Sequence, residues 1–196
     1  MAERTSDHFE MRRLESLSNT IFGVAMTLLA YDLPRAAQLA DPPGWAEIYH
    51  LYATRLFALV LSFVIAGAFW FSHHRRLARQ PEAGRTVVFL NLIFLLSIIL
   101  LPATNGLYGT YANSSVVAVL YGFHLTVIAA LSASLWLLVP GERRDFGDLA
   151  GAFFPLLVFV PGIALASVAP RYAQHFWLLA FGALVVRRLF THRAVP

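Results

Sequence analysis

Hydroxyl and apolar side chains alternate at helical spacing in RRLESLSNTIFGVAMTLLAYDLP, residues 12–34. Positions i, i+4, i+7 and i+11 of a helix fall on one stripe, which here holds Thr20, Val24, Thr27 and Tyr31, bordered by Leu28. Apolar constrictions with a few oxygen ligands can gate and partly select ions. Several copies of such a helix around one axis would form a narrow pore.

Simpler roles remain open for parts of this stripe. Thr27 could bond a carbonyl of its own helix, and Tyr31 could be an aromatic anchor at the membrane interface. Asp32 follows at the outer end of the stretch, before Pro34. Its carboxylate could concentrate cations at a pore mouth, or it could pair with Arg35.

The composition indicates an integral membrane protein. The 196 residues are 58% hydrophobic and 13% charged, with a mean hydropathy of +0.63. An ordinary soluble domain carries about 25% charged residues. Cysteine is absent, which excludes disulfides, thiolate chemistry and cysteine-based metal sites. The arginines flank apolar runs and form no continuous patch, so nucleic-acid binding is not expected.

Six apolar segments have the length that a transmembrane helix needs, and the runs lack the alternation of strands. The expected spans are approximately 17–34, 50–72, 86–104, 115–139, 149–169 and 172–190. Twelve arginines lie on one side of this arrangement and three on the other, namely Arg35, Arg55 and Arg171. The positive-inside rule then predicts an all-α polytopic protein with both termini in the cytoplasm. Residues 1–196 would form a single six-helix unit, with a glycine-rich loop at 105–114.

This topology brings polar groups from three helices to a common depth near the cytoplasmic face. They are Ser18 and Asn19 of the first span, His73 and His74 at the end of the second, and Asn91 near the start of the third, with Arg13 close enough to join them. Polar groups in hydrocarbon tend to be paired, so we expect a hydrogen-bonded cluster. It could serve helix packing alone.

Histidine also raises the possibility of haem or metal binding. Neighbours on a helix point about 100° apart, so His73 and His74 cannot both face one metal. His124, in the middle of the fourth span, could be half of a haem pair. A buried histidine that is hydrogen-bonded for packing is the alternative.

Three motifs carry a resemblance to a known family. RLESLSNTIFGVAMTLLAYDLP resembles the first helix of the bacterial transmembrane protein 175-like potassium channels, relatives of the endolysosomal potassium channel. FWFSHHRRL resembles the family's W-x-x-H-H-R-L ending of the second helix, and FLNLIFLLSIILLPAT its N-L-x-x-L run toward proline. The resemblance covers the first three spans. The last three agree in number and hydrophobicity.

The chain departs from the family's R-x-x-x-F-S-D signature at two positions. Leu17 replaces the phenylalanine and Asn19 the aspartate. A neutral amide keeps hydrogen bonds but loses charge-assisted strength with Arg13.

The resemblance implies a homotetramer whose first helix lines a central pore without a TVGYG-type filter, and no such run occurs here. It places the pore constriction at Val24, Leu28 and Tyr31, and potassium preference at Thr27. It implies no cofactor, with K⁺ as the permeant ion.

We therefore expect a potassium-leaning cation channel that is multi-pass in a bacterial plasma membrane, is no enzyme, and has lipid and its own copies as partners. Two alternatives stay open. A haem- or quinone-binding membrane subunit would rest on His124 with His73 or His74. A non-conducting membrane scaffold would rest on the altered signature.

Overall fold

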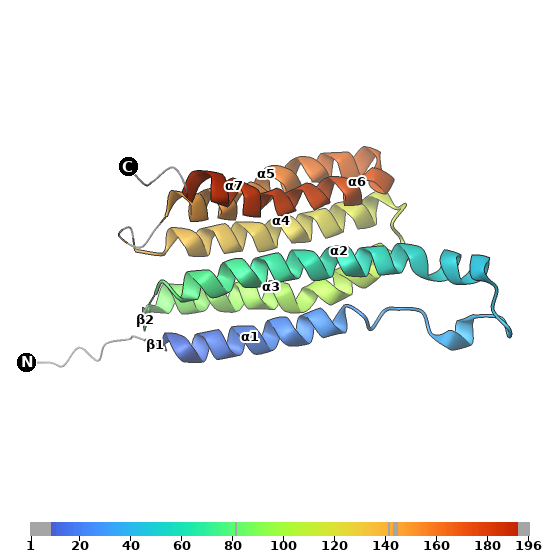
Figure 1. The fold of residues 1–196 in the computed structure, drawn as a ribbon, viewed down its shortest axis with the longest axis horizontal. Helices are drawn as coiled ribbons and strands as arrows, with labels where there is room; N and C mark the ends of the chain where they lie inside the picture. The colour runs from blue at the N-terminus through green and yellow to red at the C-terminus, as the bar shows by residue number, and fades with distance from the viewer. Residues whose placement is uncertain (1–8, 81, 141, 143–144, 192–196) are drawn as a thin grey trace, which may run out of the picture.

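The protein folds as an all-α bundle in the computed structural model, which describes residues 9–80, 82–140, 142 and 145–191. The α-helices are α1 (Met11–Leu28), α2 (Trp45–Leu77), α3 (Arg85–Thr110), α4 (Ser115–Leu137), α5 (Phe146–Val168), α6 (Pro170–Trp177) and α7 (Gly182–Thr191). Two 3₁₀ segments, η1 (Ala36–Gln38) and η3 (Leu178–Phe181), complete the helical elements described. Helix α1 lies at one side of the bundle beside α2 and α3, and α5, α6 and α7 lie at the other side, with α4 packed against both α3 and α5 (Figure 1).

Within the part of the chain that the structure describes, four helices are long and apolar enough to cross a membrane, namely α2, α3, α4 and α5. Helix α1 is more polar, because its first turns carry Arg12, Arg13 and Glu15. The expected sixth span is helical from Pro170 to Thr191 but divided, because η3 separates α6 from α7. The expected first span also ends early. After Leu28 the chain tightens into i→i+3 turns that lead to Pro34.

The expected loop at 105–114 is wrong over its first half, since α3 continues to Thr110. Tertiary contacts keep this glycine-rich segment helical. The buried Asn105 side chain accepts a hydrogen bond of 2.6 Å from Ser62 Oγ of α2. A Cβ on Gly109 would sit 3.5 Å from the backbone of Arg55, so the two helices approach closely here. Two prolines, Pro155 and Pro161, lie inside the continuous helix α5.

One short antiparallel strand pair lies outside the helices, although we expected none. Strand β1 (Phe9–Glu10) pairs with β2 (Glu82–Ala83), with Glu10 opposite Glu82. The pair ties the segment before α1 to the connection between α2 and α3. It therefore helps to fix where α1 begins.

The core between α4, α5 and α6 is organised around one indole ring. Trp177, at the end of α6, is fully buried, and its ring meets those of Tyr108 and Tyr121 at steep angles of 61° and 57°. Two glycines make room for it. A Cβ on Gly162 would lie 2.5 Å from Trp177 Nε1, and one on Gly122 would lie 3.0 Å from the ring. Trp177 thus joins α6 to both α4 and α5.

The beginning of α1 and the end of α7 lie at the same end of the bundle (Figure 1). The eight described arginines assigned to the cytoplasmic side belong to the helix ends and connections there: Arg12, Arg13, Arg75, Arg76, Arg79, Arg85, Arg187 and Arg188. Arg4, Arg143, Arg144 and Arg193 lie outside the described residues. We call this the arginine end.

Candidate functional site

The predicted stripe runs from α1 into the turn after it, where Tyr31 lies, and it faces away from the rest of the chain. Val24, Leu28 and Tyr31 are 52%, 45% and 75% exposed. The opposite side of the helix, with Phe22 and Ala25, is buried in the common core. This face of the segment is therefore free to make contacts outside the protomer.

The two threonines of this face are exposed residues whose hydroxyls bond within the helix. Thr20 Oγ1 donates to the Ser16 carbonyl at 3.0 Å, and Thr27 Oγ1 donates to the Val24 carbonyl at 2.7 Å. The Thr27 bond reaches back three residues along its own helix. Because each hydroxyl uses its hydrogen within the helix, its lone pairs remain free to accept. An exposed oxygen of this kind can bind a cation.

Asp32 is exposed overall, but its carboxylate lies directly against Gly106 of α3. A side chain at position 106 would collide with it, so the missing Cβ permits the contact. Arg55 of α2 lines the same small cavity. The carboxylate thus faces the protomer's own α2 and α3 and helps to hold the outer end of α1.

At the arginine end, a chain of hydrogen bonds links α3 and α2 to α1. Arg76 Nη2 donates to Asn91 Oδ1 at 3.1 Å and to His73 Nδ1 at 2.9 Å. Because Nδ1 accepts, a neutral imidazole carries its proton on Nε2, which lies 3.1 Å from Ser18 Oγ. Ser18 in turn donates to the Leu14 carbonyl at 2.7 Å. We call Ser18, His73, Arg76 and Asn91 the His73 cluster.

The remaining predicted members lie nearer the surface, in separate contacts. Asn19 Oδ1 accepts from the Trp70 indole at 2.9 Å, which makes a second link between α1 and α2. His74 Nδ1 lies 3.1 Å from Glu15 Oε1. Arg13 extends to the surface, where its Nε lies 3.2 Å from Glu10 Oε2.

Arg76 takes the buried arginine position that we had considered for Arg13. It is 1% exposed and had been counted among the charges that flank the second span. Its spacing of three residues from His73 places both on one helix face, which was the available signal. That signal is weak, because a charge next to a span end is normally exposed.

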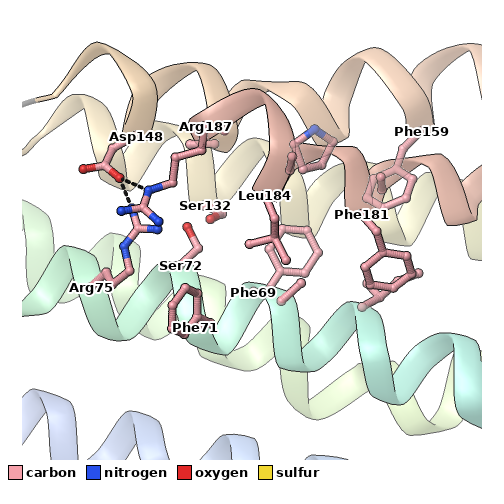
Figure 2. Close-up of a pocket in the computed structure, with 17 residues that line it drawn as sticks. Phe69, Phe71, Ser72, Arg75, Ser132, Asp148, Phe159, Phe181, Leu184 and Arg187 are labelled. Carbon is pink, nitrogen blue, oxygen red and sulfur yellow. Dashed lines mark hydrogen bonds and ion pairs between the residues drawn. The ribbon is translucent and has the colours of Figure 1, made fainter. Parts of the chain in front are cut away.

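A second charged cluster at the arginine end was not anticipated. Asp148, in the first turn of α5, is 2% exposed. It forms ion pairs with Arg75 and with Arg187, the latter at 2.8 Å (Figure 2). A third ion pair, with Arg79, has a length of 2.6 Å. We call these four residues the Asp148 cluster. It fastens α5 to α7 and to the end of α2.

The buried His73 and the half-buried His124 both use their ring nitrogens within the protein. His124 Nε2 donates to the Ser97 carbonyl at 2.9 Å, and Nδ1 lies 2.8 Å from Thr104 Oγ1. His73 is held as described above. Among the residues that the structure describes, no group of three or more His, Cys, Asp or Glu side chains could hold a metal ion. These contacts give the haem- or quinone-binding alternative no support.

The long apolar helices and the bundle they form define a multi-pass α-helical membrane protein. The family model described as endosomal/lysosomal potassium channel TMEM175 matches residues 13–102. These residues hold α1, α2 and most of α3, the part of the chain that carries the three motifs. The resemblance to this potassium channel family is therefore confirmed, and its members are ion channels rather than enzymes.

Individual relatives agree with this result. A potassium channel of Streptomyces collinus is 28% identical over 134 residues, which cover 65% of this chain and 63% of that protein. A potassium channel of a Chryseobacterium species is 22% identical and covers 85% of this chain and 88% of that protein. The endosomal/lysosomal proton channel TMEM175 of Gallus gallus is 28% identical over 56% of this chain.

A solved structure has the same fold. The crystal structure of a lysosomal potassium-selective channel TMEM175 homologue from Chamaesiphon minutus superposes with a TM-score of 0.80 at 19% identity. The match covers 90% of this chain and 97% of that one. The sequence match, in contrast, spans less than two thirds of the Streptomyces protein and 23% of the chicken protein.

Proposed function

We propose that this chain is a potassium-leaning cation channel. Four copies assemble around a central axis, and α1 of each copy lines the pore. The observation that carries the proposal is the exposed stripe of α1. The protomer buries the other side of this helix and leaves Val24, Thr27, Leu28 and Tyr31 outside its core. The names of the Streptomyces and Chryseobacterium relatives support K⁺ as the ion.

In this assembly, conduction is passive and needs no resident cofactor. Val24 and Leu28 form an apolar constriction at which an ion must shed water, and the exposed Thr27 oxygen replaces part of the lost hydration. Tyr31 adds an aromatic layer to this constriction, toward the outer mouth. The Asp32 carboxylate, held against Gly106, leaves negative charge near that mouth.

The remaining predicted residues position the pore helix. The His73 cluster holds the inner end of α1 through Ser18, while the Trp70–Asn19 bond and the His74–Glu15 pair hold its flank. Arg13, paired with Glu10, lies beside the β1–β2 link. We place the chain in a bacterial plasma membrane as one six-helix unit, with the arginine end and both termini on the cytoplasmic side.

Thr27→Ala tests the role of the stripe. One neutral hydrogen-bonding oxygen is worth about 0.5–1 kcal/mol, so removing it should lower the K⁺ over Na⁺ permeability ratio roughly two- to fivefold. The measurement is the reversal potential of the reconstituted protein under bi-ionic conditions. Thr126→Ala is the matched control, because Thr126 also bonds its own helix, at 2.8 Å to Gly122, but lies on α4. Equal reversal potentials for the wild type and Thr27→Ala would count against the proposal.

A mass measurement separates the channel from a non-conducting scaffold. The protein used for the flux assay should have the mass of four chains, together with its bound detergent or lipid. A stable tetramer without ion flux would favour the scaffold. A monomer that conducts would place the pathway inside one protomer, away from the α1 face.

A further inference from the structure

A surface groove of the bundle has an apolar lining and a charged end, the two features that a lipid-binding site needs. It holds about 510 Å³ between α2 and the segment η3–α7. Its walls are apolar and include Phe63, Val64 and Phe71 on one side and Phe181 and Leu184 on the other. Phe63, Val64, Phe71 and Leu184 are exposed, so the groove opens outward. It is lined by helices other than α1 and is separate from the proposed pore.

One end of this groove is lined by arginines and is positively charged. Arg187 and Arg188 of α7 line it at the arginine end. Arg187 also belongs to the Asp148 cluster, where Arg75 and Arg79 are its neighbours. These four arginines and one aspartate sum to a net charge of +3. Anionic headgroups of the cytoplasmic leaflet lie at the level of such juxtamembrane arginines.

The interior of the cluster cannot itself take a phosphate. The cavity behind Arg75 and Arg187, beside Ser72 and Ser132, holds about 50 Å³, which is room for a few waters (Figure 2). The Asp148 carboxylate also occupies its charged corner and would repel an anion. A phosphate would therefore lie at the rim, against Arg188 and the outer side of Arg187.

We propose that this groove binds one anionic phospholipid per chain. The acyl chain lies between α2 and α7, and the phosphate contacts Arg187 and Arg188. The apolar walls alone would accept any lipid, whereas the arginines select the negative headgroup. The bound lipid would join α7 to the middle of α2, whereas the ion pairs of Asp148 connect α7 to the end of α2.

Native mass spectrometry of the purified full-length protein tests this site. Phosphatidylglycerol and phosphatidylcholine with identical acyl chains are titrated separately, and bound lipid per chain is counted. We expect phosphatidylglycerol to bind at least fivefold more tightly. Arg188→Gln should weaken phosphatidylglycerol about fivefold, because one basic residue near the membrane surface contributes that factor, and should leave phosphatidylcholine unchanged. Val64→Trp, which fills the groove, should weaken both lipids.

Arg171→Gln is the charge-matched control, since Arg171 lies at the opposite end of the bundle, at the start of α6. Equal affinity for the two lipids, or no response to Arg188→Gln, would overturn the proposal. Inorganic phosphate that competes fully and is indifferent to Val64→Trp would show a free-anion site instead. Because the chain has no cysteine, Leu184→Cys can report a second copy in the groove. Efficient disulfide-linked dimers of that variant would also overturn it.

Discussion

The His73 cluster and the Asp148 cluster lie at the same end of the bundle, yet they use charge in opposite ways. In the first, a buried guanidinium, Arg76, meets the neutral groups of His73 and Asn91. In the second, a buried carboxylate, Asp148, meets three guanidinium groups. The first cluster reaches α1, and the second ties together α2, α5 and α7.

This difference indicates that the two clusters have different structural roles. Hydrogen bonds between neutral groups and one cation depend on direction, so the His73 cluster fixes the orientation of α1 with only moderate energy. Ion pairs around a buried carboxylate become costly once one partner is lost. We therefore expect changes in the Asp148 cluster to act on the whole fold, and changes in the His73 cluster to act on the position of α1.

Asp148→Asn should have the largest effect. The substitution leaves three arginines close together without their buried counter-charge, and breaking a buried ion pair costs about 3–5 kcal/mol. The free energy of unfolding in detergent, followed by tryptophan fluorescence, should fall by about 3 kcal/mol. Asp145→Asn is the matched control, because Asp145 caps α5 through the Gly147 amide at 2.9 Å and asparagine caps equally well. Similar losses in the free energy of unfolding for the two variants would show that the Asp148 ion pairs stabilise the fold no more than the Asp145 helix cap does.

Asn91→Leu should have an intermediate effect. It removes the amide that accepts from Arg76 Nη2 at 3.1 Å, and a buried hydrogen bond to a charged group is worth about 1.5–3 kcal/mol. We expect a loss of roughly 2 kcal/mol in stability together with altered ion flux, because α1 loses part of its support. Asn113→Leu, at an exposed turn before α4, should change neither. Unaltered flux at the same loss of stability would show that the His73 cluster does not act on α1.

Asn19→Asp should have the smallest effect, and it should be favourable. Asn19 is exposed, and its amide oxygen already accepts from the Trp70 indole at 2.9 Å. A carboxylate strengthens that bond, but solvent limits the gain to less than about 1 kcal/mol. Tetramer stability or ion flux should rise slightly. In a Trp70→Phe background the gain should vanish, and an equal gain in both backgrounds would assign it to another partner.

The helices that position the candidate site could be predicted from sequence because their apolar runs are long. The stripe on α1 could be predicted for a related reason, since hydroxyls that recur at helical spacing occupy one face whatever the rest of the fold does. The structure places that face outside the protomer core. Its part in ion conduction remains a prediction.

Other features depended on contacts that spacing does not encode. Asn105 continues α3 through a glycine-rich stretch because Ser62, forty-three residues earlier, donates to it. Asp148 can be buried because three arginines, at the end of α2, just beyond it and on α7, converge on its carboxylate. In both cases the deciding partner is distant in sequence.

The tight seat of Trp177 has a consequence for how this protein can evolve. Gly122 and Gly162 leave room for the indole and for no added carbon beside it. A mutation that enlarges either glycine must therefore be accompanied by a smaller aromatic or aliphatic residue at 177. Across an alignment of close homologues, these three columns should covary, with total volume conserved while the individual residues change.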